Sequence, residues 1–507
     1  MTAPDPLDRS STIAVVGTGT MGQGIAQVAL AAGHHVRLYD AAPGRAVLAE
    51  QAITERFDRL VEKGRLDAAA RDAARARLAP AEELGELAGA ELVIEAILED
   101  LGAKQQLFTA LETVVGGDCL LATNTSSLSV TAVGAALRRP GRFLGLHFFN
   151  PAPLLPLVEV VSGAATDEAA ATAAYETMVA WGKTPVRCTD TPGFIVNRVA
   201  RPFYAEAFRL LEEGVADPAT IDAVLRECGG FRMGPFELTD LIGQDVNEAV
   251  TRSVWESFFQ DPKFTPSLAQ RRLVEAGRLG RKSGRGWYAY DGAARPEPRT
   301  AELEKAPAEV TVRPGGQGPA AVLPELIAEA GIEVVEGAPD GAFDGCIELP
   351  GGGLLCLADG DLATAFGDDR VQFDLALDYR AATRIALAPS DTARPETVQA
   401  AIGLLQALGK KVSVIDDTPG LIVARTVAML VDFAADAVAK GVASPDDIDI
   451  AMRLGVNYPL GPLQWGELLG ADWVCDFLKL MHTTHPTGRY APSHLLIRRA
   501  ASQERLL

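Results

Sequence analysis

The chain has 507 residues, and at 48% hydrophobic content this length predicts about three or four globular domains. The net charge of −20 argues against nucleic acid or an anionic membrane surface as the main partner. No uninterrupted apolar run is long enough for a membrane span, and the polar N-terminus does not resemble a secretory signal. The six cysteines form no CxxC pair, so we expect free thiols and a cytoplasmic location.

The first 150 residues alternate short apolar, β-branched runs with amphipathic segments. This alternation is typical of a doubly wound parallel sheet. We expect strands at 12–16, 35–39, 91–97, 120–123 and 143–147, and helices at 21–32, 45–78 (broken near Gly64) and 104–115.

A GxGxxG pattern lies between the first expected strand and the first expected helix. Glycines at these points permit a tight turn, close approach of a pyrophosphate and close helix packing, and the helix N-terminus favours negative charge. Asp40 ends the next strand, where a carboxylate accepts hydrogen bonds from a ribose and would repel a 2′-phosphate. The pattern predicts NAD, with FAD as the second possibility. The expected cofactor-binding residues of this region are Gly17, Gly19, Thr20, Met21, Gly22 and Asp40.

A histidine lies in the apolar run Leu144–Phe149, and a glutamate follows twelve residues later in Leu157–Val161, which reads as the next strand. An imidazole oriented by a carboxylate can move a hydroxyl proton at neutral pH. Taken alone, His147 would more often be a satisfied core histidine and Glu159 a paired edge carboxylate. Their occurrence downstream of the glycine loop favours a shared catalytic site instead.

The run Thr123–Ser127 follows an expected strand and should face the carboxyl edge of the sheet, where ligands bind in this architecture. Its hydroxyls and its amide can hold a substrate oxygen. By itself, such a run is more often a polar turn or a helix cap.

From Asp190 onward the pattern becomes helical, and an internal repeat appears. The run Asp190–Val196 recurs as Asp417–Val423, and Gly234–Pro235 recurs with the same spacing as Gly461–Pro462. The repeat predicts a second copy of the helical domain. We expect a Rossmann-type domain at 1–189, a helical domain at 190–291, a linker at 292–320, a degenerate αβ segment at 321–410 and the second helical copy at 411–507. An unrelated small αβ insert is the alternative for 321–410.

The ordered motifs resemble the NAD-dependent (S)-3-hydroxyacyl-CoA dehydrogenase family. They cover residues 12–290, and the second half is similar to the extra C-terminal domain of long bacterial members, including those of phenylacetate-type aromatic catabolism. The matching stretches are VGTGTMGQGIA from Val16, NTSSL from Asn124, GLHFFNP from Gly145, LVEVV from Leu157, DTPGFIVNR from Asp190 and GPFELTDL from Gly234.

The resemblance implies a role for each matching position. His147 is the general base on the 3-hydroxyl, and Glu159 orients and stabilises its imidazolium. Ser126 and Asn197 hydrogen-bond the reacting oxygen or the imidazole. Further positions implied to contact the cofactor are Glu99, Lys104, Asn150 and Lys282.

The resemblance also implies CoA contacts on the expected helix after Asp40. Lys63 matches a CoA-contacting lysine, whereas Arg56 stands where some members have a CoA-contacting serine. On an acidic protein, CoA phosphates need a local basic surface, and Arg56, Arg59, Lys63 and Arg65 could supply one. An ordinary solvated charged face is the alternative, because acidic residues interleave.

The second helical copy has Ala424 at the position of Asn197, and no histidine occurs between His147 and His482. We therefore expect one active site, in the first 290 residues. The duplicate should pair with the first helical copy inside the chain, with a homodimer possible. His482 and His485 lack a suggestive third ligand, so no metal is expected.

The sequence thus predicts an NAD-dependent oxidoreductase of (S)-3-hydroxyacyl-CoA, in fatty-acid (β-oxidation) or phenylacetate-type degradation. The alternatives are a dehydrogenase of a free hydroxy acid or polyol on the same fold, and a catalytically silent NAD-binding protein. Short-chain (3-hydroxybutyryl) and dicarboxylic (3-hydroxyadipyl) acyl chains both remain open.

Overall fold

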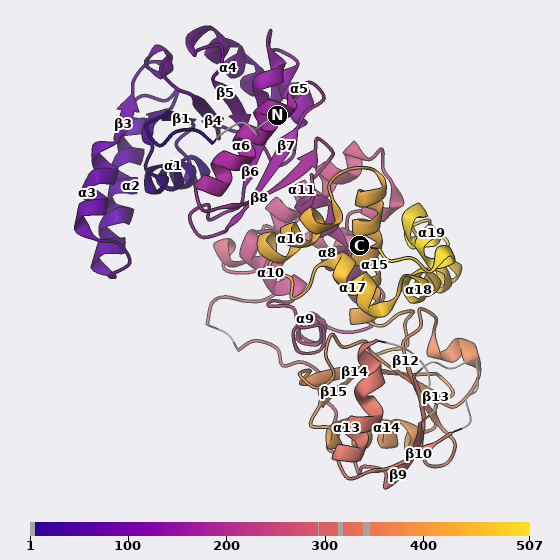
Figure 1. Ribbon diagram of the computed structural model, residues 1–507. Coiled ribbons are helices and arrows are strands. Elements are labelled where there is room, and N and C mark those ends of the chain that lie inside the picture. The colour runs from indigo at the N-terminus through magenta and orange to yellow at the C-terminus, as the bar shows by residue number, and fades with distance from the viewer. Residues whose placement is uncertain (1–5, 293, 313–317, 338–344, 507) are drawn as a thin grey trace. The chain divides into compact units, whose positions relative to one another are not determined.

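A computed structural model describes residues 6–292, 294–312, 318–337 and 345–506 (Figure 1). The chain forms two compact units. Unit 1 contains residues 1–197 and 441–456, and unit 2 contains residues 198–440 and 457–507.

Unit 1 is a twisted sheet covered by helices (Figure 1, indigo to magenta, with α16 in orange). The sheet is eight-stranded, in the order β3-β2-β1-β4-β5-β6-β7-β8. All neighbouring strands are parallel except β6 and β7, which are antiparallel. The strands are β1 Thr12–Val16, β2 His35–Tyr39, β3 Leu78–Ala81, β4 Leu92–Glu95, β5 Leu120–Thr123, β6 Phe143–Phe148, β7 Leu157–Ser162 and β8 Thr184–Thr189. The helices are α1 Thr20–Ala32, α2 Arg45–Glu62, α3 Ala68–Ala76, α4 Leu101–Val114, α5 Val130–Gly134, α6 Glu168–Ala180, α7 Val196–Val199 and α16 Pro445–Gly455.

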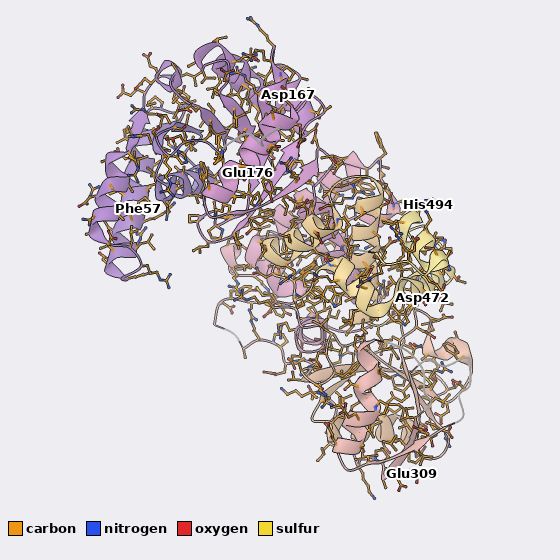
Figure 2. All side chains as sticks on the ribbon, in the orientation of Figure 1. Phe57, Asp167, Glu176, Glu309, Asp472 and His494 are labelled. Atoms are coloured by element: carbon orange, nitrogen blue, oxygen red, sulfur yellow. A yellow bond between two sulfur atoms is a disulfide. The ribbon has the colours of Figure 1, made fainter. Side chains whose placement is uncertain are left out.

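The strand order places the chain reversal between β1 and β4, where the connections leave in opposite directions and ligands bind in open α/β sheets. The central strands are apolar because both faces are covered; Ile13, Val15 and Ile94, for example, have no exposed surface. Helix α2 packs on this core through Phe57, which is 3% exposed and is labelled in Figure 2. The expected helical stretch at 45–78 is α2 and α3, but its last residue, Leu78, begins strand β3.

Helix α16 comes from the second helical copy, yet it packs within unit 1 against β7 and β8. The backbone N–H of Thr189 donates to the carbonyl of Val442 at 2.8 Å. A side chain on Gly455, at the end of α16, would meet Leu157 and Val196. This close approach explains a glycine at that position.

Unit 2 combines the two helical copies with a second sheet (Figure 1, magenta to yellow). Each helix of the first copy has a counterpart in the second copy at the repeat spacing, which is the difference in residue number between Asp190 and Asp417. Helices α10 and α17 begin and end at equivalent residues, and so do helices α11 and α18. The helices of unit 2 are α8 Arg201–Glu212, α9 Pro218–Glu227, α10 Pro235–Ile242, α11 Gln244–Ser257, α12 Leu268–Glu275, α13 Leu323–Glu329, α14 Pro395–Ala407, α15 Val423–Ala439, α17 Pro462–Leu469, α18 Ala471–Thr484 and α19 His494–Ser502.

The second sheet is seven-stranded, in the order β10-β9-β11-β12-β13-β14-β15. Its last four strands repeat the parallel, antiparallel, parallel sequence of β5 to β8. The strands are β9 Glu309–Val312, β10 Glu333–Glu336, β11 Cys346–Glu348, β12 Leu354–Leu357, β13 Arg370–Phe373, β14 Arg384–Pro389 and β15 Lys411–Val414.

The repeat therefore begins earlier than Asp190. Strand β7 and helix α6 recur as β14 and α14 at the same repeat spacing. Side-chain contacts recur as well, since Lys183 Nζ donates to the carbonyl of Leu155 and Lys410 Nζ donates to that of Ala382. The degenerate αβ segment is thus the carboxyl half of a second Rossmann-type sheet. The half that would carry a glycine loop has no counterpart among the described residues.

Two aspartates from the repeated DTPG motif show why the motif persists. Asp190 accepts from the backbone N–H groups of Val130 and Thr131 at the start of α5, at 3.0 and 2.7 Å. Asp417 accepts from the backbone N–H groups of Ala363 and Thr364, at the start of the short 3-10 helix Ala363–Phe366, at 2.9 and 2.8 Å. Each carboxylate thereby satisfies otherwise unpaired donors at the start of a helix.

Two expectations need correction. The expected linker at 292–320 contains β9, because its alternation buries Val310 (2% exposed) and lets the strand pair with β10 and β11; Glu309, labelled in Figure 2, begins it. The second sheet also extends past residue 410, through β15. Residues 293, 313–317 and 338–344 of these segments lie outside the described part.

The expectation of six free thiols is wrong for one pair. Cys346 and Cys356 face each other on antiparallel β11 and β12 and form a disulfide. Cys119, Cys188, Cys228 and Cys475 are free and buried. Across the described residues, no helix is long and apolar enough to cross a membrane.

Candidate active site

The glycine loop lies between β1 and α1, at the point where the strand order reverses. Gly17 has φ of +94°, and a side chain there would lie 2.5 Å from the carbonyl oxygen of Ala96. A side chain on Gly22 would meet the carbonyl of Gly17, whereas the space beside Gly19 is open to 4 Å. The loop therefore leaves room for a ligand only at its tip, beside the start of α1. This geometry fits a dinucleotide pyrophosphate.

Asp40 follows β2 beside this loop. Its carboxylate accepts from the hydroxyl of Thr18 at 2.6 Å and from the backbone N–H of Ala42 at 3.0 Å. Burial raises the pKa of Asp40, but these hydrogen bonds and the charge of Arg45 outweigh burial and hold the pKa below its usual range. Asp40 is therefore ionised, which favours ribose hydroxyls over a 2′-phosphate.

His147 and Glu159 face each other on antiparallel β6 and β7. His147 Nδ1 lies 2.6 Å from a carboxylate oxygen of Glu159, and the two residues are 6% and 0% exposed. The rings of Phe149 and Phe194 lie 4.6 and 5.7 Å from the imidazole. The pairing leaves Nε2 without a hydrogen-bond partner in the described part of the chain, so one ring nitrogen is available to a substrate.

The second oxygen of Glu159 accepts from the backbone N–H groups of Ile195 and Val196, at 3.0 and 2.9 Å. Asn197 is the next residue, in the single turn of α7. One buried carboxylate thus holds both the imidazole and the segment that carries Asn197.

Ser126 lies in the loop after β5, which is the strand beside β6. Asn124 of this loop accepts from the backbone N–H of Phe148 at 2.8 Å, next to His147. The loop is also held by Glu99, which accepts from the backbone N–H of Ser126 at 2.9 Å and from the hydroxyl of Thr125 at 2.6 Å.

Behind this loop lies an ion network that the sequence did not reveal. Lys104, 1% exposed, lies 2.6 Å from Glu95 and 3.2 Å from Glu99. Burial raises the pKa of Glu99, but the charge of Lys104 and hydrogen bonds from the Ser126 loop outweigh it and lower the pKa. Glu95 is fully buried at the end of β4 and also accepts from the hydroxyl of Thr123 at 2.7 Å. The sequence signal for this network was Glu95, an acid at the end of an otherwise apolar strand.

Basic residues at the end of α2 and just after it line a cavity of about 370 Å³ in unit 1. Its wall includes the start of α1, the end of α2 and the turn after β6. Arg56 also donates to the side chain of Gln23 at 2.7 Å. The charged or polar lining residues are Thr20, Gln27, Arg56, Arg59, Lys63, Arg65 and Asn150. The cavity thus joins the expected CoA residues to the cofactor loop.

Lys282 is the one expected site residue that unit 1 does not contain. It belongs to unit 2, where it forms an exposed ion pair of 2.6 Å with Asp245.

Comparison with known proteins agrees with this geometry. Residues 12–191 match the family described as 3-hydroxyacyl-CoA dehydrogenase, NAD binding domain, and residues 193–290 and 420–505 both match its C-terminal domain. Residues 355–419 match the 3-hydroxybutyryl-CoA dehydrogenase reduced Rossmann-fold domain. The chain belongs to the 3-hydroxyacyl-CoA dehydrogenase family.

Individual relatives extend over the whole chain or over its first half. The 3-hydroxyadipyl-CoA dehydrogenase of Escherichia coli is 44% identical over 96% of this chain and 97% of its own length. A crystal structure of 3-hydroxybutyryl-CoA dehydrogenase from the same organism aligns with a TM-score of 0.89 at 43% identity, covering 98% and 99% of the chains. The 3-hydroxybutyryl-CoA dehydrogenase of Mycobacterium tuberculosis is 40% identical over 56% of this chain and 99% of its own.

Membership of the family confirms the expected fold class: a Rossmann-type domain, a helical domain, a degenerate αβ segment and a second helical copy. It confirms NAD as the cofactor and an NAD-dependent dehydrogenase as the kind of enzyme. The alternative of an unrelated αβ insert is excluded by the reduced Rossmann-fold match.

Proposed function

We propose that this dehydrogenase oxidises (S)-3-hydroxyacyl-CoA to 3-oxoacyl-CoA, with His147 as the general base. The observation that carries the proposal is the buried 2.6 Å pair of His147 Nδ1 with Glu159, on strands next to the loop of Ser126. Bound NAD⁺ supplies the hydride acceptor for C3 of the substrate. The chain itself binds the reactants, excludes water and moves the proton.

In this proposal, Nε2 of His147 takes the proton of the 3-hydroxyl, because Nδ1 is engaged by Glu159. Glu159 fixes the ring orientation and stabilises the imidazolium that forms. The phenyl rings of Phe149 and Phe194 limit the access of water to the imidazole.

Ser126 and Asn197 would hold the reacting oxygen. Their positions support this role, since Ser126 lies on a loop bonded to β6 and Asn197 follows the backbone amides held by Glu159. Hydrogen-bond donors fixed in place before the reaction act on developing charge without reorganisation.

The cofactor would lie along Gly17, Gly19, Thr20, Met21 and Gly22, with Asp40 on the adenosine ribose. Glu99, Lys104, Asn150 and Lys282 remain proposed cofactor contacts. The basic cavity at the end of α2 supports CoA binding by Arg56 and Lys63, because it concentrates positive charge on an acidic protein.

The variant His147→Gln tests the general base. Glutamine keeps a similar shape but cannot accept the hydroxyl proton, so turnover should fall by roughly 10² to 10⁴. Fluorescence titration should find NADH binding within about twofold of wild type, since the glycine loop is untouched. Turnover equal to wild type would exclude His147 as the base.

The substrate class is proposed to be a CoA thioester of a short or dicarboxylic 3-hydroxy acid, in fatty-acid or phenylacetate-type degradation. Relatives named for 3-hydroxybutyryl-CoA and 3-hydroxyadipyl-CoA support this range. Reduction of acetoacetyl-CoA and of free acetoacetate should be compared. Equal kcat/KM for the two would favour the alternative, a free hydroxy-acid dehydrogenase.

We further propose that the two helical copies pair within one chain, with a homodimer still possible. Ion pairs in unit 2 support this, because each copy contributes an arginine that pairs with a carboxylate of the other copy. Arg198 pairs with Asp436 of α15 at 2.8 Å, and its repeat counterpart Arg425 pairs with Glu213, which follows α8, at 2.8 Å. Helix α9 meets β14 through Arg384 and Glu227, as its counterpart α16 meets β7 and β8.

This pairing predicts that a chain ending after Tyr290 exposes the face of α8 and self-associates. Analytical ultracentrifugation should find the shortened chain to be dimeric, because it lacks the second helical copy that covers this face in the full chain. A folded, monomeric shortened chain would contradict the pairing.

The cytoplasmic location stays a prediction.

A further inference from the structure

A chain of hydrogen bonds within unit 1 connects the basic cavity to the cofactor loop. The guanidinium of Arg56 donates to the side-chain oxygen of Gln23 at 2.7 Å. The side-chain nitrogen of Gln23 donates in turn to the backbone carbonyl of Thr18 at 2.8 Å. Thr18 lies between the first two glycines of the loop, and its N–H and hydroxyl both donate to Asp40, at 3.0 and 2.6 Å. The link therefore runs from a cavity residue to the carboxylate proposed to hold the adenosine ribose.

At the cavity end of this link, Arg56 has donors left for an anion. It precedes Phe57, which Figure 2 labels on α2, and it lines the cavity. Within the described part of the chain, only one of its terminal nitrogens forms a hydrogen bond, and a guanidinium carries several N–H donors. The nearby acid Asp58 pairs with Arg71 instead, at 3.1 Å. Arg56 can therefore bind a phosphate and keep its bond to Gln23.

Gln23 itself lies in the first turn of α1. Three other residues of this helix, Thr20, Gly24 and Gln27, line the cavity. Both ends of the Gln23 amide are engaged, one by the loop and one by Arg56. A side chain held at both ends cannot shift at one end without straining or breaking the bond at the other. Because Gln23 is uncharged, the link can also be removed without changing the charge of either site.

We propose that Gln23 couples the two ligand sites of unit 1, so that a CoA thioester in the cavity makes binding of the cofactor more favourable. The inference rests on the proposed function, which places CoA at Arg56, and adds to it a positioning residue that joins substrate to cofactor. A phosphate on Arg56 would immobilise the guanidinium and, through Gln23, the carbonyl of Thr18. The cofactor would then meet a loop that is already ordered and would lose less conformational entropy on binding.

Repulsion between the two ligands acts in the opposite direction, since both carry phosphates. Salt screens this repulsion over a distance of about 8 to 10 Å. Replacing Gln23 by another uncharged residue leaves the repulsion as it is. A comparison of wild type with such a variant therefore isolates the hydrogen-bonded link.

The test measures the binding of NADH to the full chain with and without saturating butyryl-CoA. Butyryl-CoA has no 3-oxygen, so NADH cannot reduce it at C3. The coupling factor is the Kd of NADH without butyryl-CoA divided by the Kd with it, both from fluorescence titration. This factor should be at least about threefold larger in wild type than in Gln23→Met, which keeps the length of the side chain but loses both hydrogen bonds. Methionine is a good helix former, so α1 should be retained.

Two further measurements identify the route of the coupling. Calorimetry should find that NADH raises the affinity for butyryl-CoA by the same factor, because a coupling free energy is reciprocal. Arg56→Met, and the double variant with Gln23→Met, should have the coupling factor of Gln23→Met alone, since each variant breaks the same link. Losses that add up in the double variant would contradict the link, because the two side chains would then act separately.

Lys63→Met is the matched control. Lys63 lines the same cavity, and its side chain forms no hydrogen bond within the described part of the chain. Its loss should weaken the binding of butyryl-CoA, because a cation is removed, and should leave the coupling factor within about threefold of wild type. A larger fall in the coupling factor would show that the coupling depends on the charge of the cavity, which would overturn the inference.

A coupling factor in Gln23→Met within threefold of wild type would also overturn the inference. In that case, reduction of acetoacetyl-CoA by wild type would leave the proposed function intact. Absence of both butyryl-CoA binding and turnover of any CoA thioester would instead contradict the proposed function, on which the inference rests.

Discussion

At the residue scale, one carboxylate joins three parts of the candidate site. Glu159 pairs with the imidazole of His147 and accepts from the amides that precede Asn197. In the second sheet, the repeat counterpart of His147 is Asp374, and that of Glu159 is Ala386. In the second sheet, the carboxylate therefore lies at the end of β13, the counterpart of β6, and not on β14, the counterpart of β7.

Asp374 nevertheless performs the same structural task as Glu159. It accepts from the backbone N–H groups of Ile422, Val423 and Ala424 at 3.1, 2.8 and 3.0 Å. A buried acceptor at this helix start is therefore kept in both copies, whereas the imidazole is present in one. This difference supports a single catalytic site per chain.

The ion network behind the Ser126 loop leads to a second residue-scale prediction. Glu95→Gln should cost about 3 to 5 kcal/mol of stability, because it leaves the buried Lys104 with only Glu99 as a partner. The kcat should fall as well, since Glu99 holds the amide of Ser126. Urea unfolding and steady-state kinetics measure both effects.

The control for that prediction is the double variant Glu95→Gln with Lys104→Met. Removing both charges avoids an unpaired buried ion, so the double variant should be more stable than Glu95→Gln alone. A double variant that loses the sum of the two single effects would show that the two side chains do not interact.

At the element scale, helices α8 and α15 are joined by an ion cluster in which Arg425 and Glu206 are fully buried. Arg425 lies 2.8 Å from both Glu206 and Glu213, and Arg489 also contacts Glu206. Burial raises the pKa of Glu206, but the charges of Arg489 and Arg425 outweigh burial and lower it to about 2. Glu206 therefore stays ionised between the two helical copies.

Arg425→Ala should destabilise unit 2 by about 3 to 5 kcal/mol, because it leaves Glu213 unpaired and Glu206 with one cation fewer. The matched control is Arg505→Ala, because the guanidinium of Arg505 is largely exposed and its pair with Glu467 should be worth less than about 1 kcal/mol. Guanidinium unfolding of both variants measures the difference. Equal losses would mean that burial of the cluster has no energetic importance.

At the scale of the whole molecule, the stability of the fold should depend on pH, because burial shifts the pKa of some carboxyl groups. Burial raises the pKa of Asp374 to about 6, and the backbone hydrogen bonds oppose it only in part. A raised folded-state pKa means that the group stabilises the fold fully below its unfolded pKa. This contribution is lost as pH rises through about 6.

The variant Asp374→Asn cannot titrate there, so it isolates the effect. The stability of wild type relative to Asp374→Asn should decrease by about 3 kcal/mol between pH 4 and pH 7. Urea unfolding at several pH values checks this. A difference that stays constant, or grows with pH, would show that the backbone hydrogen bonds keep Asp374 ionised throughout.

Local patterns were enough for much of the architecture. The glycine loop, the alternation of strands and helices and the constant spacing of the repeated motifs each depend on short stretches of chain. They determined the fold class, the cofactor and the duplication of the helical domain. The order of family motifs added the kind of dehydrogenase, because each motif is specific within a few residues.

Other features depend on residues that are distant in the chain, and only the tertiary structure decided them. The repeat before Asp190 is carried by strand pairing and buried contacts rather than by a recurring motif. Strand β9 forms because distant strands offer it partners, although its composition is that of a linker. The partners of Glu95 follow from packing alone. Sequence determined which groups the chain has, and burial decided which of them are paired.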